Sequence, residues 1–219
     1  MKLFKNGDLP PQAHMWLIYG DGGTGKTTLF RDAPGKKKLL ISFDLSTDVL
    51  RGAKGIDVGI IEQGDMPSVQ HMIEKCLNWA ISEYDTIGLD NVSALQNMVL
   101  ENIDGASKDG RQNYQKLQLW FRQMGTVLRQ ANVNVYATAH QIDKGPEFMN
   151  GRYEADMNAK TFNAFTSMFD VVGRIYVKEG KRLIDLDPEQ GNHAKNRLDD
   201  RKLINASELF QANQVKKEK

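Results

Sequence analysis

The residues best suited to chemistry form a glycine-rich segment near the N-terminus. Gly20 and Gly25 are separated by four residues and precede Lys26 and Thr27, directly after the apolar run of residues 15–19. This is the Walker A pattern, and it lies between a predicted strand and a predicted helix, the context in which the pattern is specific. Glycine lets backbone N–H groups turn toward a phosphate, and the N-terminus of the following helix favours an anion. The segment therefore predicts a nucleotide-binding site.

The polar side chains of this segment and of a later strand end have separate expected roles. Lys26, in a loop that faces solvent, supplies positive charge to the β and γ phosphates. The hydroxyl of Thr27 and the carboxylate of Asp90, which follows apolar residues 86–89, are the expected groups around Mg²⁺. The alternative for Asp90 is a structural residue that ends a strand or caps the next helix. The expected nucleotide-binding residues are Gly20, Gly22, Gly23, Thr24, Gly25, Lys26, Thr27 and Thr28.

A Walker A segment predicts nucleotide binding but leaves the use of the nucleotide open. No Asn-Lys-x-Asp element follows the later strands, which argues against a GTPase. A small-molecule kinase would need an arginine-bearing lid, and the long connection of residues 141–167 contains only Arg152. The remaining large class is the oligomeric motor and recombinase ATPases, for which the expected cofactors are ATP and Mg²⁺.

Composition limits the classes further. The 219 residues carry a formal net charge of +1, which gives no overall attraction to nucleic acid or membrane, so any nucleic-acid contact must be local. The single cysteine, Cys76, excludes an internal disulfide and a cysteine-rich zinc cluster. Because no signal peptide is evident and no apolar run approaches the about 20 residues that span a bilayer, we expect a cytoplasmic protein without membrane contact.

Apolar runs alternate with helix-like segments along most of the chain. Strands are expected at residues 15–19, 39–43, 58–61, 86–89 and 133–139, and helices at residues 67–83, 93–103 and 114–130. This alternation predicts right-handed crossovers and a mostly parallel twisted sheet with helices on both faces. Residues 171–177 and 182–186, joined by a turn, predict an antiparallel hairpin at the edge of that sheet.

The remaining segments complete the expected organisation. Residues 141–167 are too polar and irregular for the core, and a connection of this length is usually functional or disordered. We expect a single α/β ATPase domain over residues 1–210, followed by a charged C-terminal tail over residues 211–219.

Several further segments, taken with Walker A, resemble the RecA-type ATPases. They span residues 89–95, 109–114, 137–140, 169–173 and 194–197, and their order and spacing carry the resemblance. It is closest to the compact, phage-encoded, single-domain RecA-like proteins of single-strand annealing and recombination. The resemblance implies a RecA-like P-loop NTPase fold, related also to the DnaB-type cores. It further implies a Mg-ATP-dependent enzyme that binds single-stranded DNA and promotes strand annealing or exchange in a bacterial or phage-infected cell.

The resemblance also implies roles for residues far from Walker A. His140 or Gln141, after the fourth core strand, would sense the γ-phosphate and pass the signal to a DNA-binding loop. Lys195 and Arg197 resemble the pair that such subunits project onto a neighbour's γ-phosphate, which implies a homo-oligomer, either a ring or a filament. The alternatives are a histidine satisfied at the sheet edge and a solvated basic stretch.

The catalytic carboxylate departs from the RecA-type pattern. Those proteins carry a glutamate two residues after the acid of the second strand, and the corresponding position here is Ser46. Compared instead with the DnaB-type helicases, Ser42-Phe43-Asp44 resembles their Ser-Leu-Glu. Asp44 would then be the base that orients water, with a side chain one methylene shorter than glutamate. We expect Asp44 to be the base, with slow hydrolysis as one consequence.

Two segments after strands are candidates for DNA contact, residues 104–113 and 141–160. Basic residues interleaved with aromatics suit a single strand, although nearby acids dilute the charge of the second segment. The candidate DNA-binding residues are Lys108, Arg111, Lys144, Arg152, Tyr153 and Lys160. The expected partners are single-stranded DNA, further copies of this chain and a single-strand-binding protein. The alternatives are a helicase or packaging-type motor subunit and a regulatory ATP-binding protein with a protein partner, which Ser46 favours.

Overall fold

The computed structural model describes residues 3–148 and 151–211. The strands are β1 (Met15–Tyr19), β2 (Lys38–Ser42), β3 (Ile56–Ile60), β4 (Thr86–Asp90), β5 (Asn134–Ala139), β6 (Gln141–Asp143), β7 (Tyr153–Ala155), β8 (Val171–Lys178), β9 (Lys181–Asp185), β10 (Lys195–Asn196) and β11 (Leu203–Asn205). The α-helices are α1 (Lys26–Leu29), α2 (Val69–Glu83), α3 (Val92–Glu101), α4 (Gly110–Ala131) and α5 (Ala159–Thr166).

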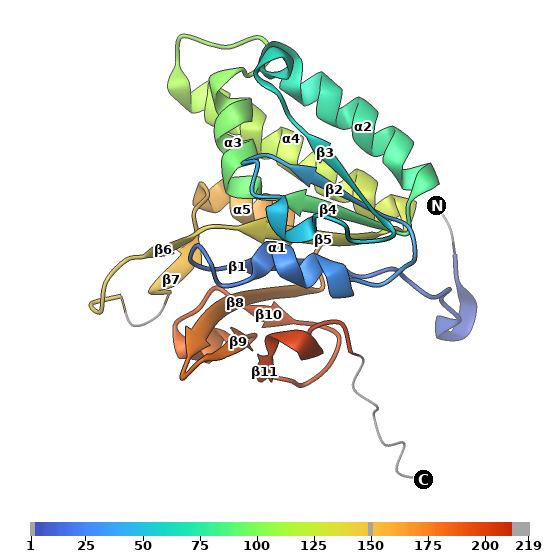
Figure 1. Ribbon diagram of the computed structural model, residues 1–219. Helices are drawn as coiled ribbons and strands as arrows, with labels where there is room; N and C mark the ends of the chain where they lie inside the picture. The colour runs from blue at the N-terminus through green and yellow to red at the C-terminus, as the bar shows by residue number, and fades with distance from the viewer. Residues whose placement is uncertain (1–2, 149–150, 212–219) are drawn as a thin grey trace.

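A mixed sheet runs through the described residues in the order β11-β9-β8-β1-β5-β4-β2-β3, with β10 paired to β8 (Figure 1). The strands from β8 to β3 along this order are parallel, and Leu17 of β1 lies opposite Ala137 of β5 and Val172 of β8. The predicted mostly parallel sheet is confirmed. The carboxyl ends of β1, β2, β4 and β5 therefore meet at one edge, which is where open α/β sheets bind ligands.

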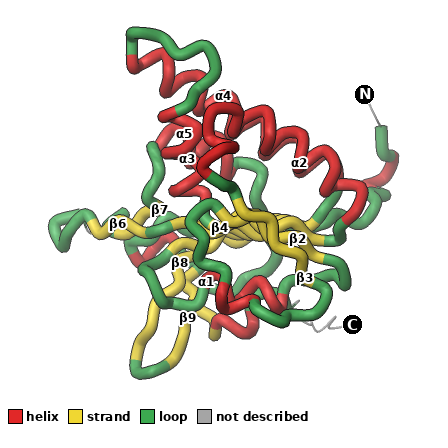
Figure 2. Tube along the Cα trace, turned by 45° about the horizontal axis from the view of Figure 1, so that its top comes forward, coloured by secondary structure: helices red, strands yellow, loops and turns green. Residues whose placement is uncertain are grey.

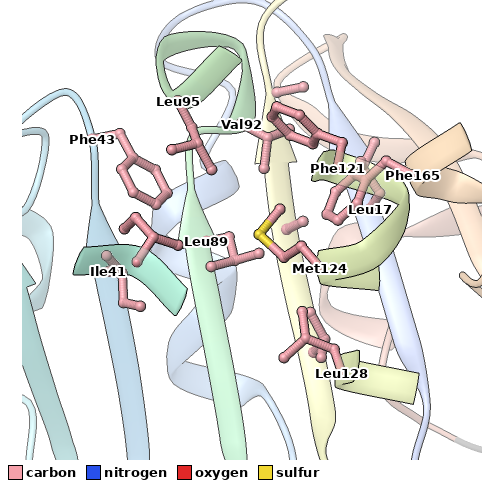
Figure 3. Close-up of a cluster of buried hydrophobic side chains, with 14 of the residues drawn as sticks. Leu17, Ile41, Phe43, Leu89, Val92, Leu95, Phe121, Met124, Leu128 and Phe165 are labelled. Carbon is pink, nitrogen blue, oxygen red and sulfur yellow. The ribbon is translucent and has the colours of Figure 1, made fainter. Parts of the chain in front are cut away.

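Both faces of the sheet are covered, which explains why its strands are continuous apolar runs. Helices α2 to α5 lie on one face and the short α1 on the other (Figure 2). On the first face, Leu17, Ile41 and Leu89 pack with Leu128 of α4 and Phe165 of α5 (Figure 3). Alternate residues such as Trp16, Ile18 and Leu40 face α1 and the C-terminal segment instead, because successive strand side chains point to opposite faces.

The long helix α4 follows the predicted pattern and begins four residues earlier than expected. Asp109 caps its start by accepting the backbone N–H of Arg111 at 3.0 Å, and Asn132 ends it in the left-handed conformation. Helix α2 begins two residues later than expected, at Val69, because residues 63–68 form 3₁₀ turns around Pro67.

The expectation that residues 141–167 stay outside the core is wrong for their second half. The segment contains the antiparallel hairpin β6–β7 and, in its second half, the helix α5, whose Phe162 and Phe165 are buried. Helix α5 packs closely on α4 at Gly125, where a Cβ would lie 3.2 Å from the carbonyl oxygen of Phe165. The sequence pattern does not indicate this helix, because it is short and lies within a polar segment. Asn158 nevertheless caps it in the usual way.

The C-terminal hairpin is confirmed as β8–β9, and β11 extends it on the far side of β9. Of the predicted charged tail, residues 211–219, all but Gln211 lie outside the described residues. The extent of the single domain therefore stays a prediction. Within the described part of the chain, none of the helices is both long enough and apolar enough to cross a membrane.

Candidate active site

The Walker A residues form a loop between β1 and α1 that lines a cleft of about 350 Å³. Gly23 and Gly25 have φ angles of +76° and +98°, in the left-handed region that favours glycine. Six of the predicted nucleotide-binding residues line the cleft: Gly22, Gly23, Gly25, Lys26, Thr27 and Thr28. The other two shape the loop: a Cβ at Gly20 would lie 2.3 Å from the carbonyl oxygen of Ile175, and the buried Thr24 donates to the carbonyl of Asp21 at 2.8 Å.

Lys26 is buried, which corrects the expectation that it lies in a solvent-facing loop. Its side chain is 8% exposed, and its ammonium donates to the carbonyl oxygens of Gly20 and Asp21, each at 2.8 Å. Burial lowers the pKa of Lys26, while the carboxylates of Asp90, Asp21 and Asp44 act in the opposite direction. The loop thus holds a cation beside its own backbone, where a bound phosphate would offer it stronger, charged acceptors.

Thr27 of α1 lies beside Asp90, the last residue of β4. The Thr27 hydroxyl donates to one carboxylate oxygen of Asp90 at 2.7 Å, and the hydroxyl of Thr138 on β5 donates to the other. Burial raises the pKa of Asp90, and the two hydroxyl donors counteract that effect. Hydroxyl and carboxylate oxygens on one side of a phosphate cradle are the donor set that Mg²⁺ takes while keeping several waters. The geometry therefore fits a Mg²⁺ ion that Thr27 and Asp90 would hold.

Asp44, Asn91 and His140 form a polar cluster on the wall of the same cleft. The side-chain amide of Asn91 donates to Asp44 and lies 3.1 Å from Nε2 of His140, which is itself 4.0 Å from the Asp44 carboxylate. The backbone N–H of Ser46 donates to the other Asp44 oxygen at 3.0 Å. Asn91, rather than Asp90, caps α3. The cluster holds a carboxylate in the cleft in a fixed orientation, which is what a base that orients water requires.

Gln141 lies outside the cleft lining and connects the Walker A loop to the next hairpin. Its amide nitrogen donates to the Asp21 carboxylate at 2.9 Å, and its amide oxygen accepts from Arg174 of β8 at the same distance. The guanidinium of Arg174 lies 3.4 Å from the centre of the Tyr153 ring on β7. His140 and Gln141 thus occupy different positions: His140 lines the cleft, and Gln141 is the first residue of β6 and bonds to the Walker A loop.

Lys195 and Arg197 are not brought to the cleft of their own chain. The ammonium of Lys195 donates to the carbonyl of Thr166 at 2.6 Å, and burial lowers the pKa of this lysine to about 8. Arg197 is exposed and makes one long contact of 3.5 Å to the carbonyl of Ser167.

Most of the candidate DNA-binding cations are paired with acids of their own segments. Lys144 lies 2.6 Å from Glu154, and Arg152 makes two 2.7 Å contacts with Asp143 across the β6–β7 hairpin. Arg111 pairs with the capping Asp109, and the guanidinium groups of Arg152 and Arg174 lie 4.8 Å and 3.4 Å from the centre of the Tyr153 ring. Among the described residues, Lys108 and Lys160 have no acidic partner within 4 Å.

Sequence reasoning missed three residues that contribute to the site. Asn91 donates to the carboxylate of Asp44, and Thr138 donates to that of Asp90. Arg182 of β9, which is distant from both in the sequence, lines the same cleft. Thr138 had a local signal, because it is a polar residue within an otherwise apolar strand. Arg182 had none, because only the pairing of distant strands brings it to the loop.

Comparisons with known proteins place the chain in a family. A family model described as an AAA domain matches residues 12–198. No curated protein matches the chain. A KaiC-like protein from the archaeon Pyrococcus horikoshii OT3 has a similar solved structure, with 13% identity, a TM-score of 0.46, and coverage of 82% of this chain and 88% of that one. The flagellar accessory protein FlaH from Methanocaldococcus jannaschii is also 13% identical, with a TM-score of 0.49 and coverage of 89% and 84%.

The family match includes every part of the site described above. It covers the phosphate-binding loop, the buried Asp90 with its two hydroxyl donors, and the parallel strands whose ends bring these groups together. A lysine and a hydroxyl at a helix N-terminus, facing a strand-end acid, are the parts with which P-loop enzymes bind Mg-ATP. The chain therefore belongs to the AAA domain family and is a P-loop ATPase that uses ATP and Mg²⁺.

Proposed function

We propose that this ATPase binds single-stranded DNA as a homo-oligomer and promotes strand annealing or exchange in phage-type recombination. The observation that carries the proposal is Gln141, whose side chain is bonded at one end to Asp21 of the Walker A loop and at the other to Arg174. Arg174 in turn packs on Tyr153 of the β6–β7 hairpin, which bears three of the candidate DNA-binding residues. A change at the nucleotide has a direct physical route to that hairpin.

In the proposed hydrolysis step, each side chain of the cleft has one task. Lys26 would bind the β and γ phosphates, and Thr27 and Asp90 would hold Mg²⁺, whose charge would offset that of the phosphates. Asp44 accepts a hydrogen bond from the attacking water and so orients it, while Asn91 keeps that carboxylate in place. His140, beside both groups, is positioned to contact the γ-phosphate or that water. Because the side chain of Asp44 is one methylene shorter than a glutamate, we expect ATP hydrolysis to be slow.

In the proposed DNA step, phosphates compete with the ion pairs of the β6–β7 hairpin. The pairs Lys144–Glu154 and Arg152–Asp143 are partly exposed, with side-chain exposures of 28–40%. Such pairs contribute only about 0 to 1 kcal/mol each, so the backbone of a single strand can displace them. Tyr153, once Arg174 withdraws with Gln141, offers a ring on which a base can stack.

The proposed oligomer supplies what the single chain lacks. Arg197 is exposed and lies away from its own cleft, as expected of a residue that acts on a neighbouring subunit. Lys195 beside it is held by Thr166 and fixes the start of this segment. An arginine delivered from a second subunit is worth about 10³ to 10⁵ in rate, which would couple hydrolysis to assembly.

The test is fluorescence anisotropy of a labelled single-stranded oligonucleotide at several salt concentrations, with and without a slowly hydrolysed ATP analogue. The analogue is expected to tighten binding. The double variant Lys144→Ala with Arg152→Ala should weaken binding for all sequences and reduce the salt slope by about 0.7 for each lost phosphate contact. The double variant Lys178→Ala with Lys181→Ala, at the tip of the β8–β9 hairpin, removes the same charge elsewhere and is the matched control.

Affinity that responds neither to the nucleotide nor to the hairpin variant would contradict the proposal. The motor-type alternative shares the fold and the ATPase chemistry, and the charge neutralisation within β6–β7 favours it over a strongly basic DNA groove. Strand displacement on a tailed duplex separates the two, because a motor unwinds the duplex whereas an annealing protein pairs separated strands.

A further inference from the structure

The β8–β9 hairpin places one cation directly against the phosphate-binding loop of its own chain. Strand β8 pairs in parallel with β1, and β9 returns beside it so that Arg182 lies opposite Val177. The Nε–H of Arg182 donates to the carbonyl of Thr24 at 3.1 Å. A Cβ at Gly25 would lie 3.0 Å from that Nε and 3.2 Å from Cδ, so the side chain rests on the loop itself.

Arg182 also differs from the arginines that are fixed by a carboxylate. Arg129, Arg152 and Arg201 each bind a carboxylate within 2.8 Å. Within the described residues, Arg182 has no acidic group within 4 Å, and its one hydrogen bond uses Nε alone. The two terminal nitrogens, with four N–H donors, remain available on a side chain that lines the nucleotide cleft.

We propose that Arg182 is a nucleotide-binding residue that acts in cis, donating from its terminal nitrogens to phosphate oxygens of the ATP bound in the Walker A loop. The bond to Thr24 fixes the guanidinium in advance, so that little further rotamer freedom is lost when phosphate binds. A planar fork of N–H donors matches phosphate oxygens, and the pairing is charge-assisted.

The charges in the cleft support this assignment. Three carboxylates, Asp90, Asp21 and Asp44, act electrostatically on Lys26, and a polyphosphate brings further negative charge. Arg182, a second cation that lines the cleft, offsets this excess of negative charge. Because Arg182 belongs to the same chain as the loop, its effect on nucleotide affinity is present in an isolated subunit. The inference goes beyond the proposed DNA function and does not depend on it.

The experiment measures binding of Mg-ATP and of tripolyphosphate by isothermal titration calorimetry on the full chain. The variants are Arg182→Ala and Arg182→Gln, and the second keeps a side-chain N–H donor for Thr24 while removing the charge. Both are expected to weaken the two ligands by at least about tenfold, the loss of one charge-assisted hydrogen bond. Lys181→Ala, an exposed neighbour on β9 outside the cleft lining, is the matched control and should bind as the parent does.

Three results would overturn the proposal. Parent-like affinity of Arg182→Ala for both ligands would remove any role in binding. Parent-like affinity of Arg182→Gln, with a loss only in Arg182→Ala, would show that the residue merely fastens the loop through Thr24. A loss for Mg-ATP without a loss for tripolyphosphate would place the contact on the nucleoside instead. Because Arg182 is exposed, thermal unfolding of the ligand-free variants is expected to match the parent and confirms that they fold.

Discussion

The orientation of the Asp44 carboxylate, the expected base, depends on two hydrogen-bond donors. Its two oxygens accept from the backbone N–H of Ser46 and the amide of Asn91, which leaves the carboxylate fixed and 24% exposed at the cleft wall. The Asp44→Asn variant is expected to keep its affinity for Mg-ATP and lose about 10² to 10⁴ in single-turnover rate, because the amide orients water poorly and cannot take its proton.

The matched control for Asp44 is Ser46→Ala, at the position where RecA-type proteins carry their glutamate. It should hydrolyse ATP as the parent does, since only the backbone of Ser46 contacts Asp44. Both variants are measured by single-turnover hydrolysis with enzyme in excess over labelled ATP. Parent-like turnover by Asp44→Asn would mean that another group orients the water.

Lys195 makes the stability of the fold depend on pH. Burial lowers its pKa to about 8 in the folded chain, below the value of a lysine exposed in the unfolded chain. Between these two values the unfolded state binds more protons, so the free energy of unfolding contributed by this group rises with pH from about 8 toward 10.5. The unfavourable contribution is complete below pH 8.

Chemical denaturation of the parent and of Lys195→Met at pH 7 to 10.5 tests this sign. The parent's free energy of unfolding should rise relative to that of the variant across the window, because the other titrating groups cancel in the difference. Lys202→Met is the control, because hydrogen bonds to Asp187 and Glu189 raise the pKa of that exposed lysine instead of lowering it. A difference that is flat, or that falls with pH, would contradict the assignment of a lowered pKa to Lys195.

Helices α4 and α5 depend on close approach at a single position. Gly125 faces Phe165, with only 3.2 Å between a hypothetical Cβ and the Phe165 carbonyl oxygen. The Gly125→Val variant is expected to lower the free energy of unfolding by about 1 to 3 kcal/mol, because the added methyl groups force the helices apart. Gly110→Val, at the start of the same helix with open space around it, should change stability little.

Urea denaturation followed by circular dichroism measures both variants. Equal stability of the two would show that α5 yields without cost and is not a fixed part of the core. Because α5 carries the Asn158 cap, which also donates its backbone N–H to Gln96 of α3 at 2.8 Å, we expect the loss to be cooperative rather than confined to α5.

At the scale of elements, the sequence predicted the parts of the fold that local pattern determines. Buried parallel strands are continuous apolar runs, so β1, β2, β4 and β5 were recognised within one or two residues. Their parallel order then brings Asp44 and Asp90 to the same edge as the Walker A loop, and the site follows from the fold. Helix α5 was missed because the whole helix is only eight residues long, which is too short to show a clear apolar periodicity.

Other parts of the site depend on long-range pairing and have no local pattern. Arg182 reaches the loop because β8 pairs with β1, a contact between residues more than 150 positions apart. The burial of Lys26 likewise follows from the loop closing on the carbonyls of Gly20 and Asp21, which a glycine-rich sequence does not reveal. The ion pairs of β6–β7 required knowledge of the hairpin register.

For the whole molecule, the separation of Arg197 from the cleft is the feature that points to assembly. If Arg197 acts on a neighbouring subunit, Arg197→Ala and Lys26→Ala chains should each be inactive alone, the first without the finger and the second without phosphate binding. Random mixed oligomers place an intact loop against an intact finger at about a quarter of their interfaces, because each partner must be the right variant. ATP hydrolysis should therefore return to about a quarter of the parent rate on mixing.

The matched control mixes Arg197→Ala with the double variant Lys26→Ala, Arg197→Ala, which supplies intact loops and no finger. That mixture should stay inactive, because changing the loop of the partner cannot replace the missing arginine. Native mass spectrometry of isotopically labelled chains verifies that subunits exchange under the assay conditions. Exchange without recovery in the first mixture would place Arg197 in its own chain's structure and would remove its proposed role on a neighbouring subunit.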